Sequence, residues 1–268
     1  MNTRNILSSE WERGGHSDSV YSLAISPDGN TIVSGSLDTT IKVWNLADDA
    51  VQVRSLPGHT GCVYSVAISP DGSTIVSGSH DTTIKVWNLA DGTLLRTLFG
   101  HKGWVESVAI SSDGNTIISV SGSNEATIKV WNLADGTLLS TLPRPPCGDA
   151  GEVWSVAISS DGSTIVSADD IAINVWNLAD GALLRTWDTR HTNYQHSVAI
   201  SPDGNTIVSG GYDDAIKVWN LADGTLLRTL FGHEGWVMSV AISPDGNTIV
   251  SGGDTTIKVW NLADEKWK

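Results

Sequence analysis

Few side chains in this 268-residue chain have the type and spacing needed for chemistry. There is no glycine-rich phosphate loop, no Gly-x-Ser-x-Gly nucleophile motif, no His-Glu-x-x-His zinc motif and no Cys-x-x-Cys pair. Cys62 and Cys147 lie in unlike sequence contexts, so they support neither a disulfide framework nor a four-ligand zinc site. We therefore expect no metal, no cofactor and no catalytic residue.

Two small groups of candidates remain. Cys62 and His80 belong to one stretch of sequence and could share a metal, but two ligands are too few for a protein metal site. Glu106 and Glu152 could act as an acid and base pair, yet acidic groups that only bind cations are far commoner. We expect the protein not to be an enzyme.

The sequence around these residues consists of repeats. The motif Ile-Lys-Val-Trp-Asn-Leu-Ala-Asp occurs six times, once as Ile-Asn-Val-Trp, with steps of 43, 44, 45, 43 and 41 residues between its tryptophans. A period of this length indicates a repeat architecture, so we predict a single domain over residues 1–268. The six tryptophans are Trp44, Trp87, Trp131, Trp176, Trp219 and Trp260.

One repeat contains four short, β-branched segments. In the second repeat these are residues 63–69, 74–77, 83–87 and 93–98, separated by Pro-Asp-Gly, Gly-Ser-His-Asp and Asn-Leu-Ala-Asp turns. A four-stranded antiparallel sheet cannot bury both faces alone, so six of them must stack around an axis. We predict an all-β, six-bladed propeller, closed by an N-terminal strand at residues 5–11 that completes the last blade.

The repeat resembles the WD-repeat propellers, through its Gly-His pair, Ser-Pro-Asp-Gly turn, Ser-Gly-Ser-x-Asp turn and Ile-Lys-Val-Trp strand; Asn replaces the family's usual Asp after each Trp. The resemblance implies a buried hydrogen-bonded chain of His, Ser, Asp and Trp in each blade, with either serine of the Ser-Gly-Ser as a member. Its implied members are His16, Asp38, Trp44, His59, Asp81, Trp87, His101, Trp131, Asp170, Trp176, His191, Asp213, Trp219, His233, Asp254 and Trp260.

Two blades depart from this pattern. The third has Glu125 in place of the turn aspartate, and the fourth has Asp149 where histidine is expected. A half-satisfied buried network is costly, so we predict that the fourth blade is locally the least stable, with residues 143–148 as a longer loop beside it.

Composition narrows the classes of partner. A net charge of −14 argues against nucleic-acid binding, which needs clustered Lys and Arg. No run of apolar residues is long enough to span a membrane, and the N-terminus lacks the pattern of a secretory signal. We expect a soluble, cytoplasmic, acidic monomer.

Three columns differ almost completely between the aligned repeats. They contain all four tyrosines and three of the tryptophans outside the repeat motif, and in a propeller they project from one rim. Surface drift would yield mostly small polar or charged residues, whereas exposed aromatic side chains mark interaction sites. The candidate partner-binding residues are Tyr21, Tyr64, His80, Trp104, Glu106, Glu152, Trp154, Tyr194, His196, Tyr212, Trp236 and Met238.

These observations favour a non-catalytic binding scaffold. We expect the rim to hold a protein or peptide partner, basic in character, through cation–π and carboxylate contacts. An alternative is a carbohydrate or small-molecule ligand that stacks on the same aromatic side chains.

Overall fold

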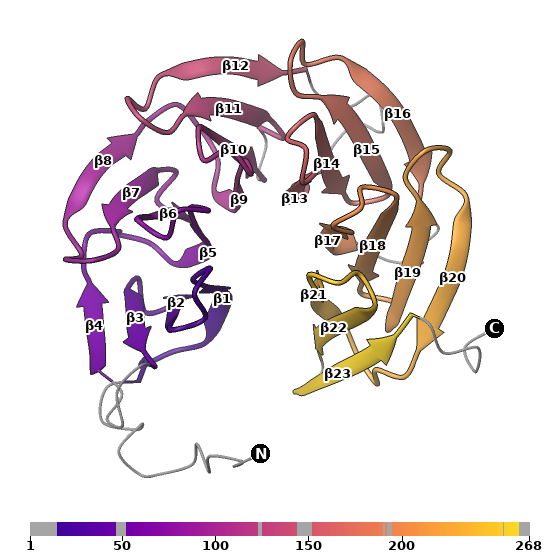
Figure 1. The fold of residues 1–268 in the computed structure, drawn as a ribbon, viewed down its shortest axis with the longest axis horizontal. Helices are drawn as coiled ribbons and strands as arrows, with labels where there is room; N and C mark the ends of the chain where they lie inside the picture. Colours follow the sequence, from indigo (N-terminus) through magenta and orange to yellow (C-terminus); the bar gives the residue numbers. More distant parts are fainter. Residues whose placement is uncertain are drawn as a thin grey trace.

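The computed structural model describes residues 15–46, 52–122, 125–143, 152–189, 191, 195–253 and 255–262. In these residues 23 strands form six antiparallel sheets arranged around a common centre (Figure 1). The predicted all-β, six-bladed propeller is therefore confirmed. Within the same residues no helix is long and apolar enough to cross a membrane.

Each blade begins with the strand nearest the centre (Figure 1). The innermost strands are β1 (Val20–Ile25), β5 (Val63–Ile68), β9 (Val105–Ile110), β13 (Val153–Ile158), β17 (Gln195–Ile200) and β21 (Val237–Ile242). The second strands are β2 (Thr31–Ser36), β6 (Thr74–Ser79), β10 (Thr116–Ser121), β14 (Thr164–Asp169), β18 (Thr206–Gly211) and β22 (Thr248–Gly253). Each second strand pairs with the innermost strand on one side and with the third strand on the other.

The repeat's tryptophan lies on the third strand of each blade. The third strands are β3 (Ile41–Asn45), β7 (Ile84–Asn88), β11 (Ile128–Asn132), β15 (Ala172–Asn177), β19 (Ala215–Asn220) and β23 (Thr256–Asn261). The outer strands are β4 (Gln52–Leu56), β8 (Leu94–Leu98), β12 (Leu138–Leu142), β16 (Leu183–Asp188) and β20 (Leu226–Phe231). The sixth sheet has three strands in the described residues, and the strand predicted at residues 5–11 lies outside them, so ring closure stays a prediction.

The aspartate of the Ser-Pro-Asp-Gly turn has a structural role. In the second blade the Ser69 hydroxyl donates to the Asp71 carboxylate at 2.5 Å, and the Thr74 N–H donates to the Ser69 oxygen at 3.0 Å. Gly72 has a φ of +71°, which glycine adopts without a steric penalty. This aspartate therefore fixes a turn between two strands.

The core lies between consecutive blades. Between the first two blades, Val33 and Val43 pack with Val63, Val66 and Trp87 of the next blade. Five such clusters occur among the described residues, one for each pair of neighbouring blades from the first to the sixth. Each fully buried Val, Ile or Trp contributes roughly 1.5–3 kcal/mol, so these interfaces are the main source of stability.

A serine hydroxyl joins neighbouring innermost strands at each of these interfaces. The Val66 N–H donates to the Ser22 oxygen at 3.0 Å, and the Val108 N–H donates to the Ser65 oxygen at the same distance. The bond recurs at the next three interfaces. The five interfaces are therefore copies of one another in polar as well as apolar contacts.

Trp187 breaks the pattern of the outer strands, where the other blades have a leucine. Its indole N–H is buried and has no hydrogen-bond partner in the described part of the chain, and its ring lies 6.4 Å from that of Trp219. An unpaired buried donor costs roughly 1–3 kcal/mol. We therefore expect Trp187→Phe to raise the free energy of unfolding by about 1 kcal/mol, measured by urea denaturation. A loss of stability would show that the indole's packing outweighs its unpaired N–H.

Candidate functional site

The three variable columns meet at one end of the propeller. The His80 N–H donates to the Cys62 carbonyl at 2.9 Å, and the Leu37 N–H donates to the Ser19 carbonyl at 2.9 Å. These bonds join the start of the innermost strand to the turn after the second strand. We use the term variable rim for the side chains at this end: Tyr21, Tyr64, His80, Trp104, Glu106, Glu152, Trp154, His196, Tyr212, Trp236 and Met238. Tyr194, the remaining candidate, lies outside the described residues.

Every innermost strand has a β-bulge at its second residue, which belongs to one of the three variable columns. In β5, Val63 pairs with Ser79 and Ser65 pairs with Gly78, so Tyr64 is an extra residue without a partner in the register. The same irregularity occurs in the other five blades. A bulge bends the strand and redirects the side chain of the extra residue. The bulged residues, which encircle the centre of the rim, are Tyr21, Tyr64, Glu106, Trp154, His196 and Met238.

Aromatic side chains on the first three blades form a continuous group, the first aromatic arc. The Tyr21 and Tyr64 rings lie 5.4 Å apart, edge to face. The Tyr64 ring lies 6.2 Å from His80, which stacks on Trp104 at 4.3 Å. Tyr21 and Trp104 are 47% and 40% exposed. Aromatic groups that contact one another and remain exposed are suited to a partner's surface.

Four further rings on the fourth to sixth blades form the second aromatic arc. His196 is stacked between Trp154 at 5.6 Å and Tyr212 at 5.7 Å, and Tyr212 stacks on Trp236 at 4.4 Å. The His196 ring nitrogen Nδ1 lies 3.0 Å from the Met238 carbonyl, and burial lowers the pKa of this imidazole. His196 is therefore neutral at pH 7 and acts as part of the stacked surface.

Glu106 is the only carboxylate among the six bulged residues. Burial, and secondly the charge of Glu152, raise the pKa of this carboxyl to about 8, and no hydrogen bond to a described residue opposes the shift. Burial and the negative charge of Glu106 raise the pKa of Tyr64 to about 12. Burial, and then Tyr21 and Glu106, also raise the pKa of Tyr212. Groups from the first five blades thus interact electrostatically at the centre of the rim.

The fourth blade exchanges the roles of two adjacent aspartates. Asp170 was expected in the buried network, but its carboxylate instead accepts the Trp154 indole N–H at 2.7 Å and the Glu152 N–H at 3.3 Å, at the rim. Asp169 pairs with Val153 as Ser79 pairs with Val63 in the second blade, so it takes the place of the second serine of the turn, and it is buried. Without a histidine to pair with, the register of this turn differs, and the expectation for Asp170 was wrong.

Asp169 makes a different buried set of bonds. Its carboxylate accepts the N–H groups of Ile171 and Ala172, and the side-chain amide of Asn174 at 2.9 Å. Trp176 still donates to Ser167, at 3.0 Å. Asn174 stands where the other repeats have lysine, so the altered Ile-Asn-Val-Trp motif has a structural reason.

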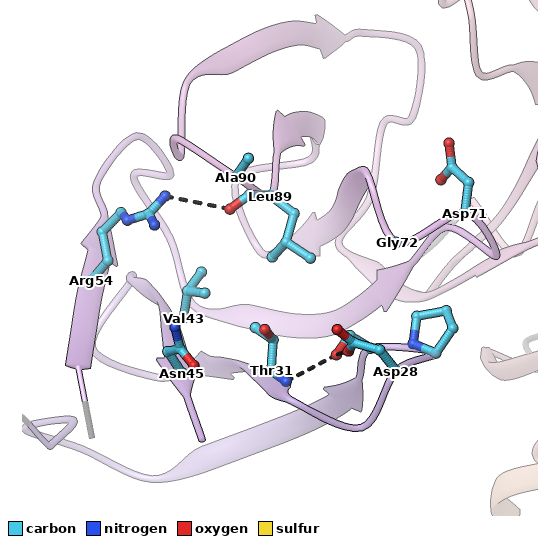
Figure 2. Close-up of a pocket in the computed structure, with 11 residues that line it drawn as sticks. Asp28, Thr31, Val43, Asn45, Arg54, Asp71, Gly72, Leu89 and Ala90 are labelled. Carbon is cyan, nitrogen blue, oxygen red and sulfur yellow. Dashed lines mark hydrogen bonds between the residues drawn. The ribbon is translucent and has the colours of Figure 1, made fainter. Parts of the chain in front are cut away.

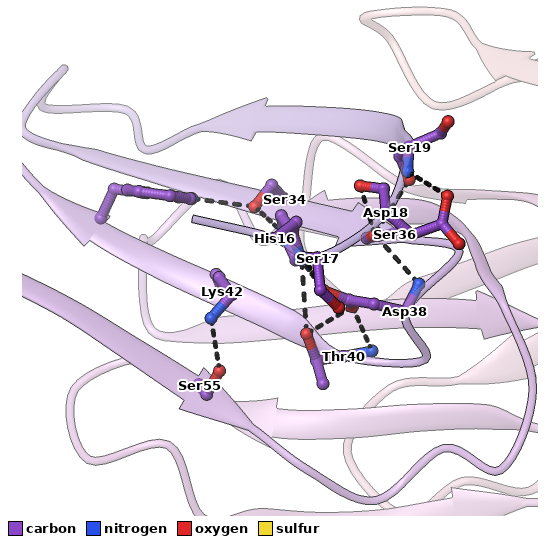
Figure 3. Close-up of polar contacts among 11 residues, drawn as sticks. His16, Ser17, Asp18, Ser19, Ser34, Ser36, Asp38, Thr40, Lys42 and Ser55 are labelled. Carbon is purple, nitrogen blue, oxygen red and sulfur yellow. Dashed lines mark hydrogen bonds and ion pairs between the residues drawn. The ribbon is translucent and has the colours of Figure 1, made fainter. Parts of the chain in front are cut away.

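The first, second and fifth blades contain the full buried chain of His, Ser, Asp and Trp. In the first, His16 lies 2.9 Å from the Asp38 carboxylate and 2.7 Å from the Ser34 hydroxyl, and Trp44 donates to Ser34 at 2.8 Å (Figure 3). The serine is thus the first of the Ser-Gly-Ser group. The second serine, Ser36, instead donates to the Ser19 carbonyl and so supports the rim turn.

The same contacts recur on the second, third, fifth and sixth blades. His59 contacts Asp81 and Ser77, and His191 contacts Asp213 and Ser209. In the sixth blade His233 and Trp260 share Ser251, while Asp254 lies outside the described residues. The tryptophans of the other three blades donate to the serines of their own blades.

Glu125 replaces the turn aspartate in the third blade without loss of the contact. Its carboxylate lies 3.1 Å from His101 and 3.2 Å from the Lys129 ammonium. Burial would raise the pKa of Glu125, but the Lys102 N–H and the adjacent His101 ring lower it to about 2. Burial lowers the pKa of His101 to about 4, so the pair consists of an anion and a neutral ring at pH 7.

This shift makes the third blade sensitive to acid. The unfolded His101 binds a proton below pH 6.5, whereas the folded one does so only below about pH 4. The unfolded state therefore binds more protons in this window, and stability falls as pH decreases through it, by about 3 kcal/mol in total. We expect the His101 imidazole to titrate near pH 4 by NMR. Titration above pH 6 would contradict the assignment.

Asp149, which replaces the fourth histidine, lies outside the described residues, so the predicted weakness of the fourth blade is untested. We expect amides of β14 and β15 to exchange with solvent faster than those of β6 and β7, because their blade lacks the histidine contact. Native-state hydrogen exchange measures this difference. Equal protection of the two blades would show that the Asp169 bonds compensate fully.

A cavity of about 380 Å³ lies between the first two blades, among the turns and corners at the end opposite the rim (Figure 2). Arg54 reaches across it and donates to the Leu89 carbonyl at 3.3 Å. The carboxylates of Asp28 and Asp71 at its mouth accept hydrogen bonds within their own turns. Arg54 therefore joins the two blades and the two aspartates hold their own turns, and we place the candidate site at the rim.

No group of three His, Cys, Asp or Glu side chains in the described ranges is placed to hold a metal ion. His80 lies within the first aromatic arc and His196 within the second. Both of these histidines thus contact aromatic rings.

The fold and these contacts define a class: a propeller of repeated antiparallel β-sheets, most of which contain a buried chain of His, Ser, a carboxylate and Trp. The model of the WD domain, G-beta repeat family matches six times, at residues 8–45, 50–88, 92–132, 136–177, 181–220 and 224–261. The chain belongs to this family, whose propellers are commonly scaffolds for protein interaction and generally not enzymes. The comparison with curated proteins found no match.

Proposed function

We propose that this propeller is a non-catalytic scaffold that holds a basic protein or peptide on the variable rim. The observation that carries the proposal is the ring of bulged residues, in which one carboxyl group stands among aromatic side chains. Glu106 is half-buried and lacks a cationic partner among the described residues. A Lys or Arg side chain entering at the centre would supply the missing charge.

The two aromatic arcs support the same partner. Tyr64 and Trp154 flank Glu106 on the neighbouring blades and belong to the same bulged column. An ammonium or guanidinium group over an aromatic face gains roughly 0.5–2 kcal/mol, more when water is excluded. Farther out, Trp104 and Trp236 offer exposed apolar area of the kind that dominates binding hot spots.

A second candidate is a carbohydrate or other flat small molecule. The second aromatic arc favours it, because Tyr212 and Trp236 stack nearly parallel, at 14°, and form a flat surface. Salt distinguishes the two: contacts that depend on the Glu106 charge weaken as ionic strength rises, whereas stacking of a neutral sugar barely responds.

The test is affinity capture from lysate, followed by identification of the bound proteins. The rim variant carries Tyr64→Ala, Trp104→Ala, Trp154→Ala and Trp236→Ala. The matched control carries Phe99→Ala and Phe231→Ala, which remove aromatic side chains that are 76% and 68% exposed and lie outside the rim. We expect the control to retain the wild-type partners and the rim variant to lose them. Capture of the same partners by all three proteins would refute the proposal.

A further inference from the structure

The two aromatic arcs occupy the same positions of the repeat, three blades apart. Each arc begins at the bulged residue of one blade, continues through the bulged residue of the next blade and the residue after its second strand, and ends at a tryptophan of the third blade. In the first arc these residues are Tyr21, Tyr64, His80 and Trp104. In the second arc they are Trp154, His196, Tyr212 and Trp236. The second and fifth blades, which supply the middle of each arc, lie on opposite sides of the ring (Figure 1).

The last two rings of each arc also agree in geometry. The His80 and Trp104 rings stack at 4.3 Å and 29°, and the Tyr212 and Trp236 rings stack at 4.4 Å and 14°. The two tryptophans are 40% and 55% exposed. The inner rings differ more, because they meet edge to face in the first arc and stack in the second. The shared feature is an exposed tryptophan backed by a stacked ring, and we call the pairs His80–Trp104 and Tyr212–Trp236 the two half-sites.

The sequences that carry the two half-site tryptophans are nearly identical. Residues 84–111 and 216–243 differ at two positions only. Each half-site has one carboxyl group within two residues of its tryptophan, Glu106 in the first and Glu234 in the second. The exchanged positions carry a lysine in the first stretch and a methionine in the second. The rim therefore presents the same aromatic surface twice, each time with one acidic group nearby.

A flat cation fits such a surface best. A guanidinium group is planar, stacks on aromatic faces and pairs with carboxylates, whereas the ammonium group of lysine is compact and strongly hydrated. Because the partner proposed for the rim is basic, arginine is the side chain that can use both the tryptophan and the carboxyl group of a half-site. Each half-site therefore favours arginine over lysine.

We propose that the two half-sites bind two identical arginine-bearing segments of a homodimeric partner. A twofold-symmetric dimer presents the same segment on opposite sides of its axis, and the half-sites lie on opposite sides of the ring. Once one segment is bound, the second binds from a high effective concentration, so the affinity of the dimer exceeds that of a single segment. This inference rests on the rim function and adds the symmetry of the partner and the residue that it presents.

The first experiment tests whether there are two half-sites. The probe is the peptide acetyl-Gly-Arg-Gly amide, titrated into the ¹⁵N-labelled protein while the indole N–H signals of Trp104 and Trp236 are followed by NMR. We expect both signals to shift, with dissociation constants within about tenfold of each other. Trp104→Ala should leave the titration of Trp236 unchanged, and Trp236→Ala should leave that of Trp104 unchanged.

The control for this titration is the same peptide with lysine in place of arginine, which keeps the charge and removes the flat group. We expect the lysine peptide to bind more weakly at both tryptophans. A shift of only one indole signal, or of neither, would overturn the proposal. Equal binding of the two peptides would overturn the choice of arginine.

The second experiment measures the stoichiometry of the complex that the protein forms with the partner it captures. We expect light scattering to give two partner chains for one propeller. Trp104→Ala and Trp236→Ala should each weaken the complex at least about tenfold, because either change removes the gain from double attachment. Phe99→Ala with Phe231→Ala is the control and should leave the affinity unchanged.

The outcomes separate this inference from the rim function. One partner chain per propeller, or a loss of affinity with only one of the two tryptophan variants, would overturn the inference while the rim function stands. Capture that the rim variant leaves unchanged would refute the rim function, and the homodimeric partner would fall with it.

Discussion

Glu106→Gln is expected to make the protein more stable while it weakens partner binding. The pKa of this carboxyl is raised from 4.5 to about 8, mainly by burial. At pH 7 the unfolded chain carries the ionised form and the folded protein the neutral form, a difference that costs about 3 kcal/mol. Glutamine keeps the shape without this cost. The expected gain in the free energy of unfolding at pH 7 is therefore about 3 kcal/mol.

The gain should depend on pH in a defined direction. Between pH 4.5 and about 8 the folded state holds a proton on Glu106 that the unfolded state has released. The contribution of Glu106 to the free energy of unfolding of the wild type therefore falls as pH rises through that window. The difference in stability between Glu106→Gln and the wild type grows accordingly. Urea denaturation of both proteins across the window measures the difference. A variant less stable than wild type throughout would show that Glu106 is held by contacts that the structure lacks.

The same substitution should act in the opposite sense on a basic partner. A cation bound beside Glu106 favours the ionised carboxylate, so wild-type affinity should rise with pH toward about 8, and the glutamine variant should lose this dependence. We expect affinity at pH 8 to fall at least about tenfold. Asp91→Asn, at an exposed corner of the opposite end, is the control. An unchanged affinity of Glu106→Gln would contradict a cationic contact at the centre of the rim.

The second large effect concerns the buried chain of the second blade. The Asp81 carboxylate accepts the N–H groups of Thr60 and Thr83 at 3.0 Å and the Thr83 hydroxyl at 2.6 Å, and it lies 2.8 Å from His59. Asp81→Ala leaves the buried His59 and Thr83 without this partner. Because the loss of one member of a buried pair costs about 3–5 kcal/mol, we expect a decrease of that size in the free energy of unfolding.

Asp91→Ala serves as the matched control for this measurement. Its carboxylate bonds only the N–H and hydroxyl of Thr93, at an exposed corner of the same blade. We expect a much smaller loss of stability there, because the carboxylate is exposed to solvent. Comparable losses at the two positions would show that the buried chain contributes no more than an ordinary turn.

The sequence predicted those features that recur in every repeat. The spacing of the tryptophans was enough to predict the number of blades, because each tryptophan marks the third strand of one blade. The histidine contacts with Asp38 and Asp81 could be placed by alignment for the same reason. The repeats therefore predict the number of blades and the buried contacts that most blades share.

The features that the alignment missed depend on local geometry. A bulge at Tyr64 follows from the pairing of Val63 and Ser65, which a list of residues in one strand does not reveal. The exchange of Asp169 and Asp170 had a signal in the Asn174 substitution, since a buried amide needs an acceptor nearby.

Oxidative footprinting of the complex with the captured partner tests the central claim most directly. Tyr21, Trp104 and Trp236 are 47%, 40% and 55% exposed on the rim, while Phe99 and Phe231 are more exposed and lie outside it. The rim proposal predicts that the partner protects the three rim side chains from oxidation and leaves both phenylalanines as reactive as in the free protein. Protection of the phenylalanines with unchanged oxidation of the rim would contradict it.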